Sequence, residues 1–492
     1  MRIGKNQYLL LYGNREDIEC CNRIYFDEYT VFLGEKCDSF ICEQDDDRFL
    51  LLGYVSNTSS ITCNFEAEAK NLLKTISPDC RNVSKITENW GGRWCAFVKK
   101  NGKLLVFGDA CSLKQIFYYS GENIDCIAVA SQARYIAEVF NLLPNEDAER
   151  YIALAQEKDK EFSYPLNKTR YSFVERVLPN HILDVRNKKV TRMSLQFFSN
   201  KNTSDIVCHI SSILMSGVCS AASARPMAVT LTGGLDSRLL FASCYKSLEK
   251  FDVVTLKYSN MRNDSHDLLT AKEICKECDV KHNVLDCKNP SAEYIDLYCA
   301  HAENPHEFWM QTAFGAYDCG YGDFLWCKGS CNEVVSLPNG ILKNKNVTPQ
   351  ILCKMFSIPI TDFSISAIDK WLLGAKSILR ESQISLIDLF YWEHRMGSWL
   401  AECLNEYDVI GETFTPFNVR SYINLVYPLD SRLKIPPKYK IFDSMLRESN
   451  LDSNRFPINN NKYKSIKAKL YLLLKYKFRK LYSLFWRFKK GR

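Results

Sequence analysis

The sequence has no uninterrupted run of about 18 apolar residues, and its first apolar stretch, Tyr8–Tyr12, is five residues long. A membrane-spanning helix needs about 20 apolar residues, and a secretory signal needs a core of about 7 to 15. We therefore expect no membrane-spanning helix, no secretion and a cytoplasmic location. The sequence also lacks GxxxxGK[ST] and GxGxxG segments, which excludes the common kinase-like phosphate loop and the dinucleotide-binding loop.

Acidic residues are absent from Lys462–Arg492, which contains twelve Lys or Arg. Removing these twelve charges from the net +7 leaves −5 for the first 461 residues. The basic character thus belongs to the tail, and we expect no nucleic acid as a partner. Because apolar residues are interleaved with the charges, two interpretations stay open: peripheral membrane contact through 462–492 at the inner face, or a solvated or partner-binding helix.

The 21 cysteines are too few for a disulfide scaffold in a chain of 492 residues. Many lie within apolar runs, such as Trp94–Phe97, so we expect buried, reduced thiols. The pair Cys275 and Cys278, followed by His282, suggests zinc, but a single CxxC on a helix favours a structural interpretation.

The length predicts two domains and a short tail. Residues 1–200 are β-rich, with hairpins expected at Asn101-Gly102 and at 186–188. Strands and helices alternate from residue 204, and helices dominate from about 350 to 450. This order predicts an α/β domain over 204–460, with a doubly wound parallel sheet and a helical C-terminal lobe, followed by the basic amphipathic tail 461–492. The strands are expected at Pro226–Leu231, Phe251–Lys257, Lys281–Asp286 and Phe324–Lys328.

The segment Thr232–Arg238 carries the chemistry. It lies between a predicted buried strand and a predicted helix, at the sheet edge where parallel folds bind ligands. The helix N-terminus offers free N–H groups and partial positive charge, and the two glycines permit close approach of phosphate oxygens. The carboxylate of Asp236 suits a Mg²⁺ ion that bridges phosphates. A plain strand–turn–helix corner is the alternative, and the order of hydroxyl, glycines, Asp and Ser favours the phosphate site.

This loop resembles the SGGxDS pyrophosphatase loop of the asparagine synthetase family, with Thr in place of the first Ser. Glu303–His306 resembles the Glu-x-Pro loop of that family, and Lys328–Glu333 resembles its glycine-rich Asp-Glu loop. The resemblance implies a PP-loop domain that binds ATP and Mg²⁺. It places the nucleotide on Leu231, Thr232, Gly233, Gly234, Leu235, Asp236, Ser237, Leu256, Gly329 and Ser330, and the metal on Asp236, Asn332 and Glu333.

The first 200 residues resemble the class II glutamine amidotransferase-like half of the family, as in Gly91–Phe97 and Asp109–Tyr119. The resemblance implies an α+β domain of the Ntn type, sandwich-like in form. The family needs a Cys directly after Met, and residue 2 is Arg, so no thioester with glutamine can form. We expect a degenerate domain without glutaminase activity, and free ammonia or another amine as the nitrogen donor.

Two further catalytic candidates join Asp236 and Glu333 in the C-terminal part. Arg395 lies where the family has an Arg near the substrate, and a bidentate contact with a carboxylate is one interpretation. An ion pair with Glu393 or Glu402 is the other. The position where the family has a Lys that neutralises pyrophosphate, four residues before an Arg, holds Asp443 ahead of Arg447. Lys440 or Lys438, from a neighbouring turn, is the candidate to take its place.

These features predict an ATP-dependent, amide-forming carbon–nitrogen ligase that adenylates a carboxylate and releases pyrophosphate. The acid is open between aspartate and a sugar acid or peptide in surface-glycan or specialised biosynthesis. A non-catalytic nucleotide-binding relative is a further alternative, favoured by Asn332 in place of Asp and by the displaced Lys. A homodimer also stays open.

Overall fold

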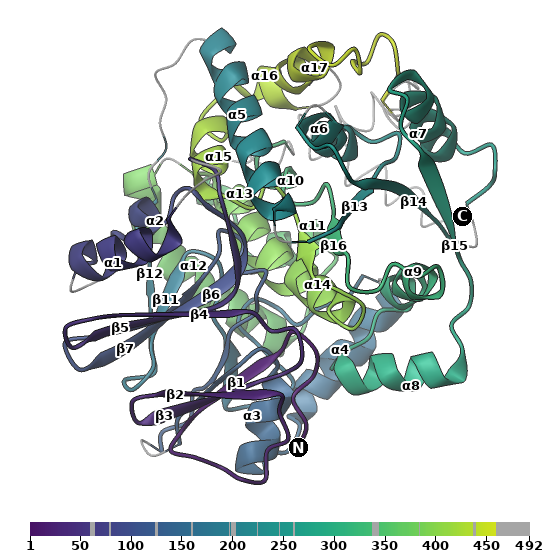
Figure 1. The fold of residues 1–492 in the computed structure, drawn as a ribbon. Coiled ribbons are helices and arrows are strands. Elements are labelled where there is room, and N and C mark those ends of the chain that lie inside the picture. Colours follow the sequence, from purple (N-terminus) through teal and green to yellow (C-terminus); the bar gives the residue numbers. More distant parts are fainter. Residues whose placement is uncertain are drawn as a thin grey trace.

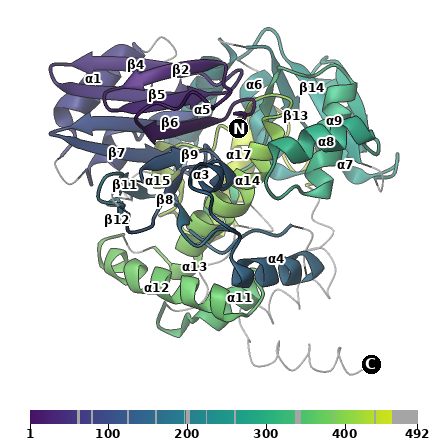
Figure 2. The same cartoon turned by 90° about the horizontal axis from the view of Figure 1, so that it is seen from below.

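The computed structural model describes residues 1–59, 64–77, 80–123, 126–158, 161–195, 197, 203–223, 225–245, 247–258, 261–336, 344–382, 384–435 and 439–458. The predicted tail 461–492 lies outside the described residues. Figure 1 shows two stacked sheets in the N-terminal half and a third sheet in the C-terminal half. Figure 2 shows α11, α12 and α13 gathered along one side of both halves.

The N-terminal half contains two antiparallel six-stranded sheets. The first has the order β10-β8-β9-β1-β3-β2 and the second β12-β11-β7-β6-β5-β4. The first sheet consists of β1 (Tyr8–Tyr12), β2 (Asn22–Phe26), β3 (Tyr29–Leu33), β8 (Phe117–Tyr119), β9 (Ala128–Ala130) and β10 (Val174–Arg176). The second consists of β4 (Ser39–Gln44), β5 (Asp47–Asn57), β6 (Trp90–Lys100), β7 (Lys103–Gly108), β11 (His181–Asp184) and β12 (Lys189–Arg192). Both predicted hairpins are confirmed as β6–β7 and β11–β12.

The strand sequences explain this stacking, because several are apolar on both faces. In β1, Tyr8 and Leu10 enter the core between the sheets, while Leu9 and Leu11 pack on the side of α3. The outer face of the second sheet is covered by α1. The result is a helix–sheet–sheet–helix sandwich, which confirms the predicted α+β fold. Its helices are α1 (Phe65–Thr75), α2 (Val83–Ile86) and α3 (Ala133–Phe140), followed by α4 (Glu146–Lys158).

The third sheet has the order β15-β14-β13-β16-β17, and every pair in it is parallel. The order reverses direction at β13, as predicted for a doubly wound sheet. Helices α6 and α7 cover one face, and α8 and α9 lie on the other (Figure 1). The elements are α5 (Thr203–Ala222), β13 (Met227–Thr230), α6 (Leu235–Tyr245), β14 (Asp252–Tyr258), α7 (His266–Glu277), β15 (His282–Cys287), α8 (Ala292–His301), α9 (Glu307–Asp318), β16 (Leu325–Cys327), α10 (Glu333–Ser336) and β17 (Thr413–Phe414).

The predicted helical lobe follows α10. It contains an unusual π-helical stretch, Tyr391–Leu400, a geometry often found near functional sites. Its elements are η1 (Asn344–Asn346), α11 (Pro349–Met355), α12 (Asp362–Ser382), α13 (Leu386–Phe390), η2 (Tyr391–Leu400), α14 (Ala401–Tyr407), α15 (Arg420–Val426), α16 (Ser431–Lys434) and α17 (Lys440–Arg447). Every cysteine in the described part of the chain is free, as expected.

One described helix, α5, is long and apolar enough to cross a membrane by length and composition alone. Its window Asp205–Ala222 has a mean hydropathy of 1.4, which differs from the expectation that no helix would qualify. However, α5 packs against β5, α6, α15 and α17. Because core helices of globular domains pass the same test, its apolar residues are accounted for by packing between the two halves.

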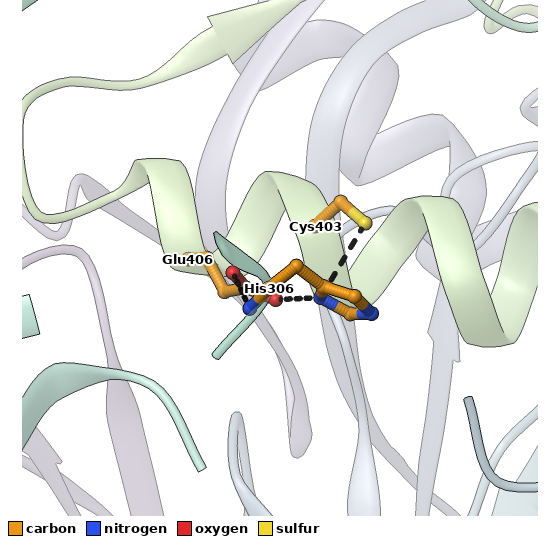
Figure 3. Close-up of side chains that lie close together, drawn as sticks. All are labelled: His306, Cys403 and Glu406. Carbon is orange, nitrogen blue, oxygen red and sulfur yellow. Dashed lines mark hydrogen bonds and ion pairs between the residues drawn. The ribbon is translucent and has the colours of Figure 1, made fainter. Parts of the chain in front are cut away.

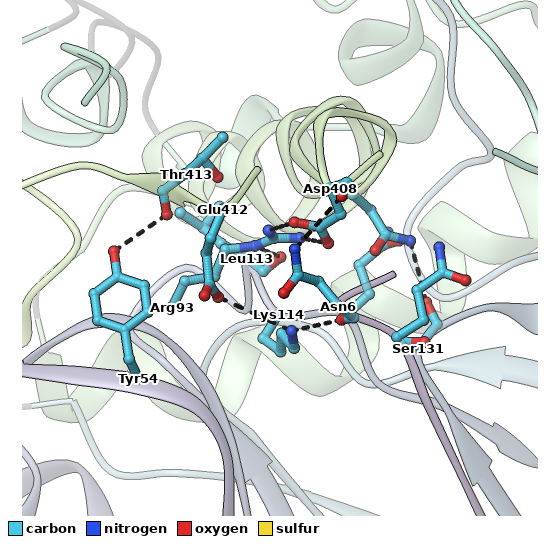
Figure 4. Close-up of polar contacts among 12 residues, drawn as sticks. Asn6, Tyr54, Arg93, Leu113, Lys114, Ser131, Asp408, Glu412 and Thr413 are labelled. Atoms are coloured by element: carbon cyan, nitrogen blue, oxygen red, sulfur yellow. Dashed lines mark hydrogen bonds and ion pairs between the residues drawn. The ribbon is translucent and has the colours of Figure 1, made fainter. Parts of the chain in front are cut away.

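A buried polar network joins the two halves (Figure 4). The Arg93 guanidinium donates to both carboxylate oxygens of Asp408, and both side chains are at most 1% exposed. The Lys114 ammonium donates to the Asn6 carbonyl at 2.7 Å and lies 4.0 Å from Glu412. Charges this deeply buried require partners, so the network fixes the N-terminal half against α14.

Candidate functional site

The loop between β13 and α6 folds back on the first turn of the helix. The Thr232 N–H donates to Ser237 Oγ at 3.2 Å, and the Gly234 N–H donates to Thr232 Oγ1 at 3.2 Å. The Gly233 N–H donates to Asp267 Oδ1 at 3.1 Å. The two hydroxyls, 2.9 Å apart, therefore fix the loop at the N-terminus of α6, where a phosphate group is favoured by the helix dipole.

The loop after β16 makes direct backbone contact with this helix N-terminus. A Cβ atom added at Gly329 would lie 2.7 Å from the Asp236 carbonyl carbon and 2.7 Å from the Ser237 nitrogen. Only glycine permits this approach, so the two predicted phosphate elements meet at one point.

Replacing Gly329 with Ala is expected to weaken Mg²⁺-ATP binding at least tenfold, because the added methyl group must push the two loops apart. Isothermal titration measures the change. Gly322→Ala is the matched control, since a Cβ at Gly322 meets nothing within 4 Å and should leave the affinity unchanged. Equal affinities of the two variants would contradict this reading of the loop contact.

The acidic side chains at this point suit a divalent cation. Burial raises the pKa of Asp236 above its ordinary value, and burial together with the Asp236 carboxylate raises the pKa of Glu333. The buried Glu333 Oε2 has no hydrogen-bond partner among the described residues. The two carboxylates repel each other, and Glu333 Oε2 has no partner in the described part of the chain. Carboxylate oxygens are the hard ligands that Mg²⁺ prefers, so Asp236 and Glu333 fit the ion that the sequence predicts.

Asn332 has a different place from the one predicted. Its amide donates to Asp236 Oδ1 at 2.6 Å, and its oxygen accepts from the Tyr422 hydroxyl. A carboxylate can only accept, so the NH₂ group must face Asp236. In this structure Asn332 thus orients Asp236 and does not present an oxygen to a metal ion.

Arg238 and Tyr422 are contributions to the site that the sequence interpretation did not assign. Arg238 is fully buried and donates to the Gly233 carbonyl at 2.8 Å, which supports the loop from below. It also donates to the carbonyls of Phe456 and Pro457. No sequence signal indicated the contacts with Phe456 and Pro457, which lie 218 and 219 residues from Arg238, or the contact of Tyr422 with Asn332, 90 residues away.

Leu231, Leu256 and Ser330 are three further residues that the sequence predicts to bind the nucleotide. Leu231 is buried, and its carbonyl accepts from Thr255 Oγ1 at 2.7 Å beside the half-buried Leu256. Ser330 accepts from Thr415 Oγ1 at 2.5 Å through its carbonyl. The segments that follow β13 and β16 are thereby tied to their neighbours at the carboxyl ends of the strands.

Arg395 forms no ion pair with Glu393 or Glu402 in the described part of the chain, and its contact with a substrate carboxylate stays a prediction. Its guanidinium lies 3.4 Å from the Trp399 ring centre and donates to the Glu161 carbonyl at 3.5 Å. It lies close enough to lower the pKa of Glu333, opposing the effect of burial. The contact with Trp399 replaces the ion pair with Glu393 or Glu402, because Glu393 is occupied by Arg192 and Trp371.

Lys440 is exposed at the first residue of α17, and Arg447 pairs with Asp443 at 3.0 Å. The other candidate, Lys438, lies outside the described residues. Among the described residues Lys440 forms no hydrogen bond or ion pair with the loop at 232–237, and its carbonyl accepts from Ser444 Oγ at 2.8 Å.

A second polar cluster lies beneath the site, where His306, Cys403 and Glu406 come together (Figure 3). His306 Nδ1 donates to Glu406 Oε1 at 2.5 Å, and Nε2 donates to the Phe162 carbonyl at 2.8 Å. Because both acceptors lack protons, both ring nitrogens carry one, and neither has a lone pair for a metal. The cluster is a structural support for the loop at 303–306.

The CxxC segment, with Cys275 and Cys278, is the other place where the sequence suggested a metal site. His282 hydrogen-bonds Thr255 Oγ1 at 2.8 Å, and the only group of metal-ligand side chains found in the described part of the chain is the His306 cluster. Cys275 belongs to the hydrophobic core, and the partly buried Cys278 packs against that core.

Comparison with known proteins agrees with this geometry over part of the chain. Residues 219–320 match the asparagine synthase family model, which spans β13, its loop, and the chain through α9. No curated protein matches the chain.

Several solved structures share limited similarity. They include an NH3-dependent NAD synthetase from Campylobacter jejuni in complex with nitrate (16% identity, TM-score 0.22, covering 40% of this chain and 95% of the other). A glutamine phosphoribosylpyrophosphate amidotransferase from B. subtilis in complex with ADP and GMP is 9% identical (TM-score 0.24, covering 58% and 85%). A glutamine-dependent NAD+ synthetase from Acinetobacter baumannii in complex with ADP is 14% identical (TM-score 0.20, covering 60% and 74%).

Proposed function

Residues 219–320 belong to an asparagine synthase-type domain, and we propose that the chain is an ATP-dependent ligase that joins a carboxylate to an amine. The observation that carries this proposal is the meeting of three elements at one sheet edge. They are the hydroxyl-braced loop Thr232–Gly234, the Gly329 backbone in contact with α6, and the carboxylate pair of Asp236 and Glu333.

The proposed reaction begins when a substrate carboxylate oxygen attacks the α-phosphorus of ATP. The bond to the β-phosphate oxygen breaks, and pyrophosphate leaves. An amine then attacks the carbonyl carbon of the acyl-adenylate, AMP leaves with the electrons of the broken anhydride C–O bond, and the amine nitrogen loses a proton to solvent. The amides of the α6 N-terminus would hold the phosphates, and Asp236 and Glu333 would hold Mg²⁺, which would supply positive charge opposite the phosphate oxygens.

The N-terminal half supports an external nitrogen source. Arg2 has a side chain that is 79% exposed and lies 3.5 Å from Glu19 at the surface, so residue 2 does not point between the sheets. No nucleophile stands at the position that glutamine hydrolysis requires.

We therefore expect amide formation with ammonium and none with glutamine, measured as product by mass spectrometry. Arg2→Cys should not restore the use of glutamine, because the new thiol would face solvent beside Glu19. Turnover of glutamine by the unaltered chain would overturn the assignment of the N-terminal half as degenerate.

A panel of acids tests the proposal itself. Pyrophosphate release is measured with aspartate, a hexuronic acid and short acidic peptides, each with Mg²⁺-ATP and ammonium. Release with one acid identifies the substrate class. Binding of Mg²⁺-ATP without release for any acid would favour the non-catalytic alternative, for which the orientation of Asn332 is the supporting observation.

A further inference from the structure

A groove of about 920 Å³ lies away from the nucleotide loop, where the β11–β12 hairpin and α2 face α12 and α15. Ligand sites commonly have volumes of about 300 to 1,000 Å³. Its floor has open space beside Gly374, where an added Cβ meets nothing within 4 Å. The groove therefore has the size of a binding site that the ligase chemistry does not use.

The lining of the groove is strongly basic. Its only acidic member is Glu88, whereas its cationic members are Arg81, Lys85, Lys189, Arg192 and Arg420. Arg192 pairs with Glu393, whereas Arg420 has no ion pair within 4.0 Å in the described part of the chain. Burial lowers the pKa of Arg420, although Asp109 and Glu393 are near enough to oppose that shift. The positive charge of the groove thus favours an anionic ligand.

Arg420 is the strongest indication of an anion site among these residues, because it is only 4% exposed. It donates to Asn180 Oδ1 at 2.7 Å, and its other polar contact is the Met193 sulfur at 3.7 Å. A buried guanidinium is ordinarily matched by a carboxylate or phosphate. Arg420 therefore marks the point in the groove where an anionic group would be held.

The open edge of the second sheet runs along the same groove. The strand β12 is the end strand, and the Met193 N–H donates to the Asn180 carbonyl at 2.7 Å. The antiparallel alternation then turns the N–H and C=O groups of Val190 and Arg192 away from β11. Both residues line the groove, so it offers main-chain donors and acceptors to an extended chain.

We propose that this groove binds an extended acidic peptide segment, which pairs with the open edge of β12 and places a carboxylate on Arg420. A polysaccharide or polyphosphate would satisfy the charges but has no backbone amides to pair with β12. The site is independent of the ligase proposal, because binding requires neither nucleotide nor Mg²⁺.

The test uses the full chain and a fluorescein-labelled peptide, Glu-Val-Glu-Val-Glu-Val, with fluorescence anisotropy in the absence of ATP. Lys189→Glu reverses an exposed charge on the groove and should weaken binding about fivefold. Lys276→Glu, the same change on α7, should have no effect. Val190→Pro removes one outward N–H and should weaken binding about tenfold, whereas Val190→Ala keeps the N–H and most of the affinity.

Circular dichroism confirms that each variant is folded. A peptide N-methylated at its valines should bind at least tenfold more weakly than the parent. Equal affinity of the methylated peptide, or displacement of the peptide by polyphosphate with no effect of Val190→Pro, would show a general polyanion surface and overturn the proposal. Failure of the parent peptide to bind would overturn it as well.

Discussion

Asp236→Asn is expected to lower the rate of carboxylate-dependent pyrophosphate release by about 100- to 1,000-fold, the loss typical when one charged group that stabilises a transition state is removed. The change is nearly isosteric. An Asn at this position can still accept the hydrogen bond from Asn332, which is 2.6 Å long, so the loop should keep its shape. What is lost is one of the two carboxylates facing the phosphates, and with it part of the affinity for Mg²⁺.

The measurement is a coupled pyrophosphate assay at saturating Mg²⁺-ATP with the acid found active in the panel. Asp369→Asn makes the same chemical change on the exposed face of α12 and should retain full activity. Raising the Mg²⁺ concentration should recover part of the rate of Asp236→Asn, because the weakened metal site fills again. An unchanged rate for Asp236→Asn would show that the loop at 232–237 takes no part in the reaction.

The architecture could be predicted because it depends on local patterns. The Asn101-Gly102 turn adopts positive φ angles of 51° and 72°, as a type I′ hairpin requires. The alternation of strands and helices after residue 204 is enough to specify a parallel sheet, because crossover connections leave few topologies. The position of the loop Thr232–Gly234 between β13 and α6 was predictable for the same reason, because it depends on the local sequence.

The parts of the site that escaped prediction depend on contacts between distant segments. Tyr422 reaches Asn332 across 90 residues and donates its hydroxyl hydrogen bond to the amide oxygen. Arg238 supports Gly233 only because the segment at 456–457 returns to the start of α6. Lys440 was chosen only because it lies one turn from the position that Asp443 occupies, and closeness along the chain does not determine whether a side chain turns toward the loop.

The contact between the two halves of the chain makes the strongest prediction about stability. Asp408→Ala should destabilise the protein by about 3–5 kcal/mol, because the Arg93 guanidinium would remain buried without its carboxylate. Among the described residues, the hydrogen bond from Arg93 Nε to the Leu113 carbonyl, at 3.0 Å, is the one that would be left to the guanidinium. Urea denaturation followed by tryptophan fluorescence measures the loss. Asp147→Ala, which removes an exposed partner of Arg150, should cost less than about 1 kcal/mol.

A double variant separates the value of the ion pair from the cost of leaving one charge alone. Arg93→Met combined with Asp408→Leu removes both charges and keeps much of the buried volume, so it should be more stable than Asp408→Ala. If the single variant proved as stable as the unaltered chain, water or a rearranged side chain would have to reach Arg93. The two halves would then not be held by this network. If the double variant also kept its affinity for Mg²⁺-ATP, the pair would be shown to serve the fold and not the nucleotide site.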